Sequence, residues 1–114
     1  MKSILSNERE CYVCGTPLNL HRHHIWGGGR RKLSEKHGCW VYLCAKHHNM
    51  SDKGVHFNKA LDTELKQDCQ EMWEWLRFTN ICAERVTDDT FPEFEEIESE
   101  VRAEFIRIFG RNYL

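Results

Sequence analysis

The sequence predicts an α+β fold, with two short strands in the first half of the chain and helices in the second. Trp40–Cys44 is β-branched and aromatic, which favours a strand, and Leu18–Ile25 is the candidate for its partner. In the second half, apolar side chains recur at steps of three and four residues, which is the spacing of one helix face. The expected architecture is therefore a β-hairpin followed by helices.

The length of 114 residues favours a single domain, with a core over residues 1–60 and a helical extension over residues 61–114 packed on that core. Hydrophobic residues make up 40% and charged residues 30%, as in an ordinary globular protein. No stretch approaches the roughly 18 apolar residues of a membrane span. Nothing at the start resembles a signal peptide, so we expect a cytoplasmic protein that does not enter a membrane.

Local signals place the connecting segments of the first half. Residues 1–10 are expected to be a flexible or short helical lead-in. Residues 27–32 are expected to be a loop, because three consecutive glycines sustain neither helix nor strand, so the hairpin should have an extended tip. A short helix or turn should follow His48 and break at Gly54.

The second half should hold two helices. Asn58 is a plausible N-cap for the first, whose apolar stripe comprises Leu61, Leu65, Cys69, Met72 and Leu76. The second should begin near Pro92 and stop at Gly110, with an apolar stripe of Phe94, Ile97, Val101, Phe105 and Phe109.

Charge divides the chain into two unlike halves. Residues 1–60 carry ten Lys and Arg against four Asp and Glu, a net of +6, and residues 61–114 carry six against fourteen, a net of −8. All seven histidines lie in the basic half. A basic, histidine-rich surface suits the binding of a phosphate polyanion. The alternative is that charge segregates by chance over two faces.

The six cysteines favour a metal over disulfides, since thiols stay reduced in the cytosol. Cys11-x2-Cys14 and Cys44-x2-His47 form two half-sites whose short spacers each aim two ligands inward, as tetrahedral zinc requires. Gly15 permits the tight turn after the first pair. The alternative is four unrelated residues with simply buried cysteines.

A second set of candidates is the pair His23-His24 together with His48. Adjacent strand residues point to opposite sides, so one histidine of the pair can bind a metal while the other stays free. A free imidazole titrates near neutrality and can take a proton from water. The alternative is that these are structural histidines. His21 and His37 could join the site, but nothing in the sequence requires it, and we interpret both as structural or surface residues.

These motifs resemble the HNH (ββα-metal) endonucleases. The resemblance is carried by Cys11-x2-Cys14, by His23-His24-Ile25 and by Val41-Tyr42-Leu43-Cys44-x2-His47-His48. The segments His24–Gly28, Arg31–Lys36 and Gly54–Asn58, with the closing Phe109–Leu114, are similar to small HNH proteins of bacteriophages and prophages. The core of the resemblance spans residues 11–58. It implies a ββα-metal core with a zinc knuckle, followed by C-terminal helices, in a bacterial host cell.

Carried over by position, the resemblance assigns His23 and His48 as ligands of a catalytic metal and His24 as the general base. His47 stands where the family usually has the last zinc cysteine, and His56 is a further candidate ligand if Gly54 lets the chain fold back. One departure is that no Asn lies near Cys39, where the family has its middle Asn.

The function implied is metal-dependent hydrolysis of DNA phosphodiester bonds. The implied cofactors are a structural Zn²⁺ and a catalytic divalent cation, which is Mg²⁺, Mn²⁺, Ni²⁺ or Zn²⁺. Arg30, Arg31 and Lys32 lie between the strands and are candidates for DNA phosphate contact, with a solvated basic loop as the alternative.

Two other functions stay open at this point. The first is a non-catalytic, zinc-stabilised DNA- or protein-binding module derived from the HNH fold, which the missing Asn favours. The second is a partner of a phage or host recombination or packaging protein, acting through the acidic C-terminal helices.

Overall fold

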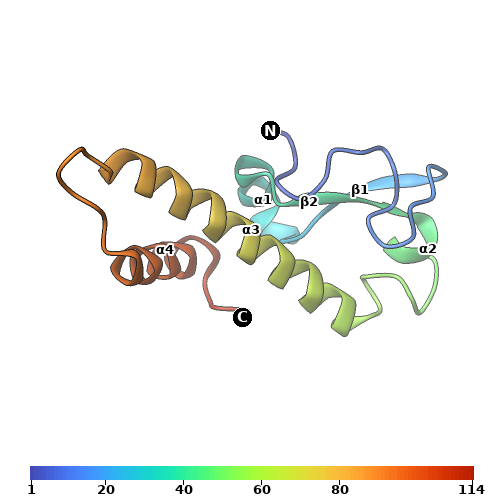
Figure 1. Ribbon diagram of the computed structural model, residues 1–114. Coiled ribbons are helices and arrows are strands. Elements are labelled where there is room, and N and C mark those ends of the chain that lie inside the picture. Colours follow the sequence, from blue (N-terminus) through green and yellow to red (C-terminus); the bar gives the residue numbers. More distant parts are fainter. The chain divides into compact units, whose positions relative to one another are not determined.

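The computed structural model describes all 114 residues, and the chain divides into two compact units, Met1–Cys69 and Gln70–Leu114. Figure 1 follows the chain through its elements. These are β1 (Leu20–His24), a 3-10 helix η1 (Gly28–Arg30), α1 (Arg31–His37), β2 (Trp40–Cys44), α2 (Ala45–His48), α3 (Lys59–Arg85) and α4 (Phe94–Phe109). The prediction of a mixed α+β fold is confirmed. None of the helices combines the length and apolar character needed to cross a bilayer.

The sheet of the first unit is a two-stranded antiparallel hairpin of β1 and β2. Leu20 pairs with Cys44 and His24 with Trp40, so the two strands match over their full lengths. Side chains alternate along a strand, which puts His21 and His23 on one face of β1 and Arg22 and His24 on the other. This alternation decides which histidines can meet.

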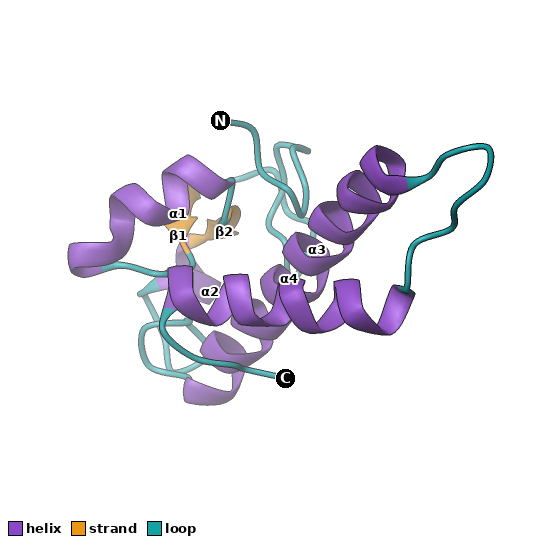
Figure 2. Ribbon diagram, turned by 90° about the vertical axis from the view of Figure 1, so that its left-hand side faces the viewer, coloured by secondary structure: helices purple, strands orange, loops and turns teal.

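The segment between the strands is helical, so the prediction of a loop over residues 27–32 with an extended tip is wrong. Among the three glycines only Gly28 has a positive φ, of 57°, and both Gly28 and Gly29 belong to η1. Arg31–His37 contains Arg, Lys, Leu and Glu, which are good helix formers and outweigh the preceding glycines. The Ser34 hydroxyl donates to the carbonyl oxygen of Trp26 and accepts from its N–H, which holds α1 against the hairpin (Figure 2).

The first ten residues form no helix, and hydrogen bonds tie them to the start of β2. The buried Ser3 donates its hydroxyl to the carbonyl of Trp40, and the N–H of Ile4 donates to the carbonyl of Gly38 at 2.9 Å. Gly38 ends α1 with a φ of 70°, and a Cβ there would lie 2.5 Å from the Lys2 carbonyl oxygen. These contacts correspond to no apolar pattern in the sequence. Of the two predicted alternatives, the short helical lead-in is wrong.

The start of α3 follows the prediction. The Asn58 side-chain oxygen accepts the N–H of Leu61 at 3.0 Å, as an N-cap does. Within the first unit, α3 buries Leu65 and Cys69. The hydroxyl of Tyr12 donates to Asp68 at 3.1 Å, which ties the segment after Cys11 to this helix.

The second unit consists of the remainder of α3, the whole of α4 and the closing segment. The ring of Trp73 on α3 meets Phe105 and Phe109 of α4, with centroids 5.5 and 6.0 Å apart. Gly110 ends α4 in the left-handed conformation, as predicted.

The predicted apolar stripes of the two helices are correct in part. On α4, Ile97, Val101, Phe105 and Phe109 are buried, but Phe94 is 56% exposed because it occupies the first turn. Glu93, rather than Pro92, adjoins that turn. The stripe on α3 includes Trp73, whereas Leu76 is 41% exposed. Trp73, one position from Met72, is the α3 side chain whose ring contacts Phe105 and Phe109 of α4.

Candidate metal centres

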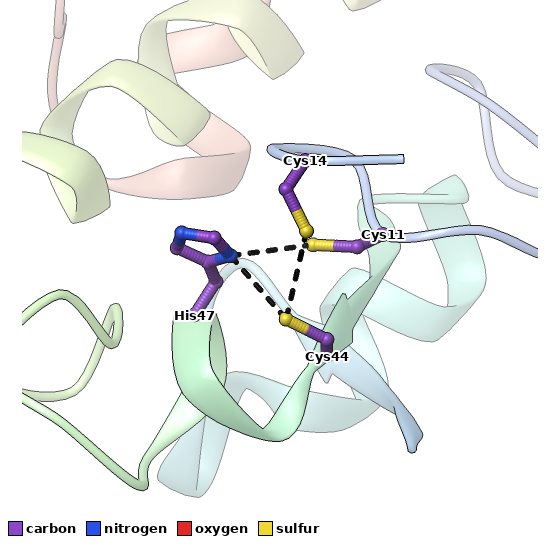
Figure 3. Close-up of side chains that lie close together, drawn as sticks. All are labelled: Cys11, Cys14, Cys44 and His47. Atoms are coloured by element: carbon purple, nitrogen blue, oxygen red, sulfur yellow. Dashed lines mark hydrogen bonds between the residues drawn. The ribbon is translucent and has the colours of Figure 1, made fainter. Parts of the chain in front are cut away.

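Three cysteines and one histidine meet at one end of the hairpin (Figure 3). Cys11 and Cys14 come from the loop before β1, which turns at Gly15 with a φ of 76° and an N–H bond from Gly15 to the carbonyl of Cys11. The other two are Cys44, the last residue of β2, and His47 of α2. We call these four residues the Cys3His group.

The distances within the Cys3His group match a tetrahedral metal site. Bonds of 2.3 Å to sulfur and about 2.05 Å to nitrogen, at tetrahedral angles, put two sulfurs about 3.8 Å apart and a sulfur and a nitrogen about 3.6 Å apart. The Cys14 and Cys44 sulfurs are 3.8 Å apart. His47 Nδ1 lies 3.3 Å from the Cys44 sulfur and 3.8 Å from the Cys11 sulfur. The four residues could therefore hold a metal such as zinc.

Backbone groups around Cys11 favour the thiolate that a metal needs. Burial opposes ionisation of this thiol, but backbone N–H groups at Cys44, Cys14 and Val13 hydrogen-bond to it and outweigh burial, so the pKa of Cys11 falls below its usual value. Burial and the two neighbouring cysteines raise the pKa of Cys44. A bound cation would favour the thiolate of Cys44 and so offset this effect.

A second cluster contains only histidines and lies beside the first. His23 comes from β1, His48 from α2 and His56 from the turn that follows Gly54. One ring nitrogen of each lies within 4.8 Å of the other two, and His48 Nε2 is 3.0 Å from His56 Nε2. We call these three residues the histidine cluster. Two consecutive residues of α2 thus belong to different groups: His47 to the Cys3His group and His48 to the histidine cluster.

The backbone before His56 folds back onto α2 because residue 54 is a glycine. The N–H of Val55 donates to the carbonyl of His47, and the N–H of His56 to that of His48. A Cβ at Gly54 would lie 2.9 Å from the His48 carbonyl oxygen, closer than side chains tolerate. This close approach puts His56 next to His48, where the sequence had suggested it as a further ligand.

Two residues of the histidine cluster are held neutral, the form in which imidazole binds metals. Burial, together with His48 and His56, lowers the pKa of His23 to about 4. Burial, together with His56 and His21, lowers the pKa of His48 to about 4. His23 Nε2 is also the one buried side-chain nitrogen or oxygen without a hydrogen-bond partner. An unpartnered buried nitrogen costs free energy unless a ligand takes it up, so this donor set fits a cation.

The structure does not bring His24 into the histidine cluster, because it points to the other face of β1. Its Nε2 lies 2.7 Å from a carboxylate oxygen of Glu35 on α1. Glu35 also accepts a hydrogen bond from Arg22, which stacks on Trp40 with its guanidinium 3.7 Å from the ring centroid. The hydrogen bond from His24, with Arg22 nearby, lowers the pKa of Glu35. His24 and Glu35 therefore form a histidine–carboxylate pair.

The remaining predicted site residues lie on the surface. Arg30, Arg31 and Lys32 are exposed at the end of η1 and in the first turn of α1. These three residues therefore lie in η1 and at the start of α1, and not in the irregular loop that was predicted.

Sequence reasoning missed two residues that the structure places at these sites. His21 Nδ1 lies 2.8 Å from His48 Nδ1, although His21 was interpreted as structural or surface. Its spacing of two from His23 on a strand was the available signal, since such residues share a face. Glu35 was missed because no helix was predicted over residues 31–37.

Comparisons with known proteins identify no relative: no family model matches the chain, and neither a curated protein nor a solved structure does.

Proposed function

We propose that this chain is a metal-dependent endonuclease of the HNH (ββα-metal) type, which hydrolyses phosphodiester bonds in DNA. The observation that carries the proposal is the buried, unpartnered nitrogen of His23 within a cluster of three imidazoles. Its position supports the proposal, because two of its three histidines come from one strand of a hairpin and from the short helix that follows the second strand.

Two cations with different tasks are part of the proposal. The Cys3His group would hold a structural zinc that fixes the end of the hairpin to α2. The histidine cluster would hold a catalytic divalent cation, for which imidazole ligands favour zinc, nickel or manganese over magnesium. Bound there, such a cation would polarise a phosphate oxygen and stabilise the charge that develops on the leaving 3′ oxygen.

His24 is proposed as the general base. Glu35 accepts the Nε2–H of His24, which leaves Nδ1 unprotonated and able to take a proton from the attacking water. The carboxylate also stabilises the imidazolium that results, as the aspartate of a Ser-His-Asp triad does.

DNA is proposed as the substrate because residues 1–60, which contain both clusters, are basic. The net charge of +6 over residues 1–60 attracts a polyanion. Arg30, Arg31 and Lys32 are exposed and are proposed to contact backbone phosphates. Such contacts position a duplex without reading its sequence.

Nicking of supercoiled plasmid tests this function. The unaltered chain, carrying its structural zinc, is assayed with added Mn²⁺, Ni²⁺, Zn²⁺ or Mg²⁺, and with a chelator as the blank. We expect nicking with at least one cation, and loss of at least a hundredfold in rate for His23→Ala, since the cation stabilises charge in the transition state.

Two outcomes contradict the endonuclease proposal. One is the absence of nicking with every cation by a protein that binds plasmid DNA, which would make the chain a binding module. The other is equal nicking by the unaltered chain and by His23→Ala, which would trace the activity to a contaminant.

A further inference from the structure

We infer that His21 is a positioning residue for the histidine cluster, which holds His48 in the tautomer that binds a cation through Nε2. The inference rests on the proposed function, because it concerns the same cation. It goes beyond that function by assigning a role to a residue that no motif marks.

The ring of His48 has different neighbours at its two nitrogens. Nε2 faces the cluster, 3.0 Å from His56 Nε2. Nδ1 points away from that contact and lies 2.8 Å from His21 Nδ1. The His21 and His48 rings meet edge to face, at 77° with centroids 5.0 Å apart. His21 therefore contacts His48 from the side opposite to His56.

Proton counting fixes the roles in this contact. Two imidazole nitrogens at hydrogen-bond distance share one proton, so one donates and the other accepts. A neutral imidazole carries one proton, and the nitrogen that binds a metal must carry none. If His48 binds a cation through Nε2, its proton is on Nδ1. His21 Nδ1 must then accept that proton's hydrogen bond, and His21 keeps its own proton on Nε2.

The position of His21 suits orientation rather than ligation. It does not belong to the three residues whose ligand atoms converge. It lies inside β1, paired with Leu43 across the hairpin, so its backbone is held by the sheet. The partner of a metal-bound histidine works by fixing ring orientation and proton position, and its loss commonly costs ten- to a hundredfold in metal affinity.

Cobalt(II) titration tests the inference without relying on activity. Co²⁺ is added to the full chain already carrying one equivalent of zinc, and both the dissociation constant and the visible absorption spectrum are recorded. His21→Ala is expected to weaken Co²⁺ binding about ten- to a hundredfold while the shape of the spectrum stays the same, because no ligand is lost. His21→Asn is expected to restore most of the affinity, because its side-chain oxygen can accept the same N–H bond.

Nitrogen-15 NMR of the histidine rings gives a second readout. With zinc at the Cys3His group and no second cation added, the His48 ring should be the Nδ1–H tautomer in the unaltered chain and in His21→Asn, and a mixture of tautomers in His21→Ala. A role confined to packing would not change the tautomer. Retained zinc and an unchanged thermal midpoint verify that each variant is folded.

The outcomes separate this inference from the proposed function. Co²⁺ binding by the unaltered chain with equal affinity in His21→Ala overturns the role of His21 alone. A changed Co²⁺ spectrum in His21→Ala also overturns it, since His21 would then be a ligand. Failure of the unaltered chain to bind Co²⁺ beyond its zinc contradicts the proposed catalytic site, and the inference with it.

Discussion

Replacing Cys44 with serine is expected to remove the structural metal and unfold the first unit. The Cys44 sulfur lies close to two other members of the Cys3His group, 3.8 Å from the Cys14 sulfur and 3.3 Å from His47 Nδ1. A structural zinc contributes about 10–16 kcal/mol to the folding of zinc-finger peptides at neutral pH. That matches or exceeds the whole stability of an ordinary domain, about 5–15 kcal/mol. The hairpin has only two strands, which alone are marginal in water.

Zinc content and circular dichroism during heating measure this effect. The variant should contain no tightly bound zinc and should lack a cooperative transition, and a chelator should do the same to the unaltered chain. Cys82→Ser is the matched control, because Cys82 is a half-buried cysteine of α3 outside the Cys3His group. Cooperative unfolding of Cys44→Ser at the temperature of the unaltered chain would contradict a metal at this group.

Replacing His24 with alanine is expected to lower the rate of DNA cleavage by about a hundred- to ten-thousandfold, the usual contribution of a general base. Both metals should stay bound, because His24 lies on the opposite face of β1 from His23. Glu35→Gln should reduce the rate less than His24→Ala does, since an amide oxygen can still accept the Nε2–H but carries no charge to stabilise the imidazolium.

Single-turnover cleavage rates and metal content, measured on the same samples, check this prediction. His37→Ala serves as the control, because it removes a histidine that belongs to neither group and should leave both values unchanged. An unchanged rate in His24→Ala would remove it from the mechanism. Loss of the second metal in His24→Ala would instead make it a ligand.

Sequence reasoning succeeded where the signal was local. A spacer of two residues fixes the geometry of a chelating turn, so Cys11 with Cys14, and Cys44 with His47, could be proposed from spacing. The strand over Trp40–Cys44 and the cap at Asn58 depend on the residues themselves and were predicted correctly. The close approach at Gly54 was also foreseeable, since only glycine fits there.

Sequence reasoning failed where long-range packing decides the structure. The composition of residues 31–37 favours a helix, but this helix is held in place by contacts of Ser34 with Trp26 and of Gly38 with residues 2–4. No periodicity in the segment predicts these contacts. Because this helix was not predicted, Glu35 was not recognised as the partner of His24. His21 was missed for a different reason. The prediction considered the adjacent pair His23-His24 and did not use the fact that His21 and His23, two positions apart on a strand, share a face.

Counting bound metal ions by native mass spectrometry tests the central claim most directly. The unaltered chain, purified and then supplied with a small excess of zinc, is predicted to carry two ions, and His23→Ala is predicted to carry one. The remaining ion should be lost only when the Cys3His group is altered. A single ion in both proteins would show that the three imidazoles do not form a second metal site, and would contradict the account.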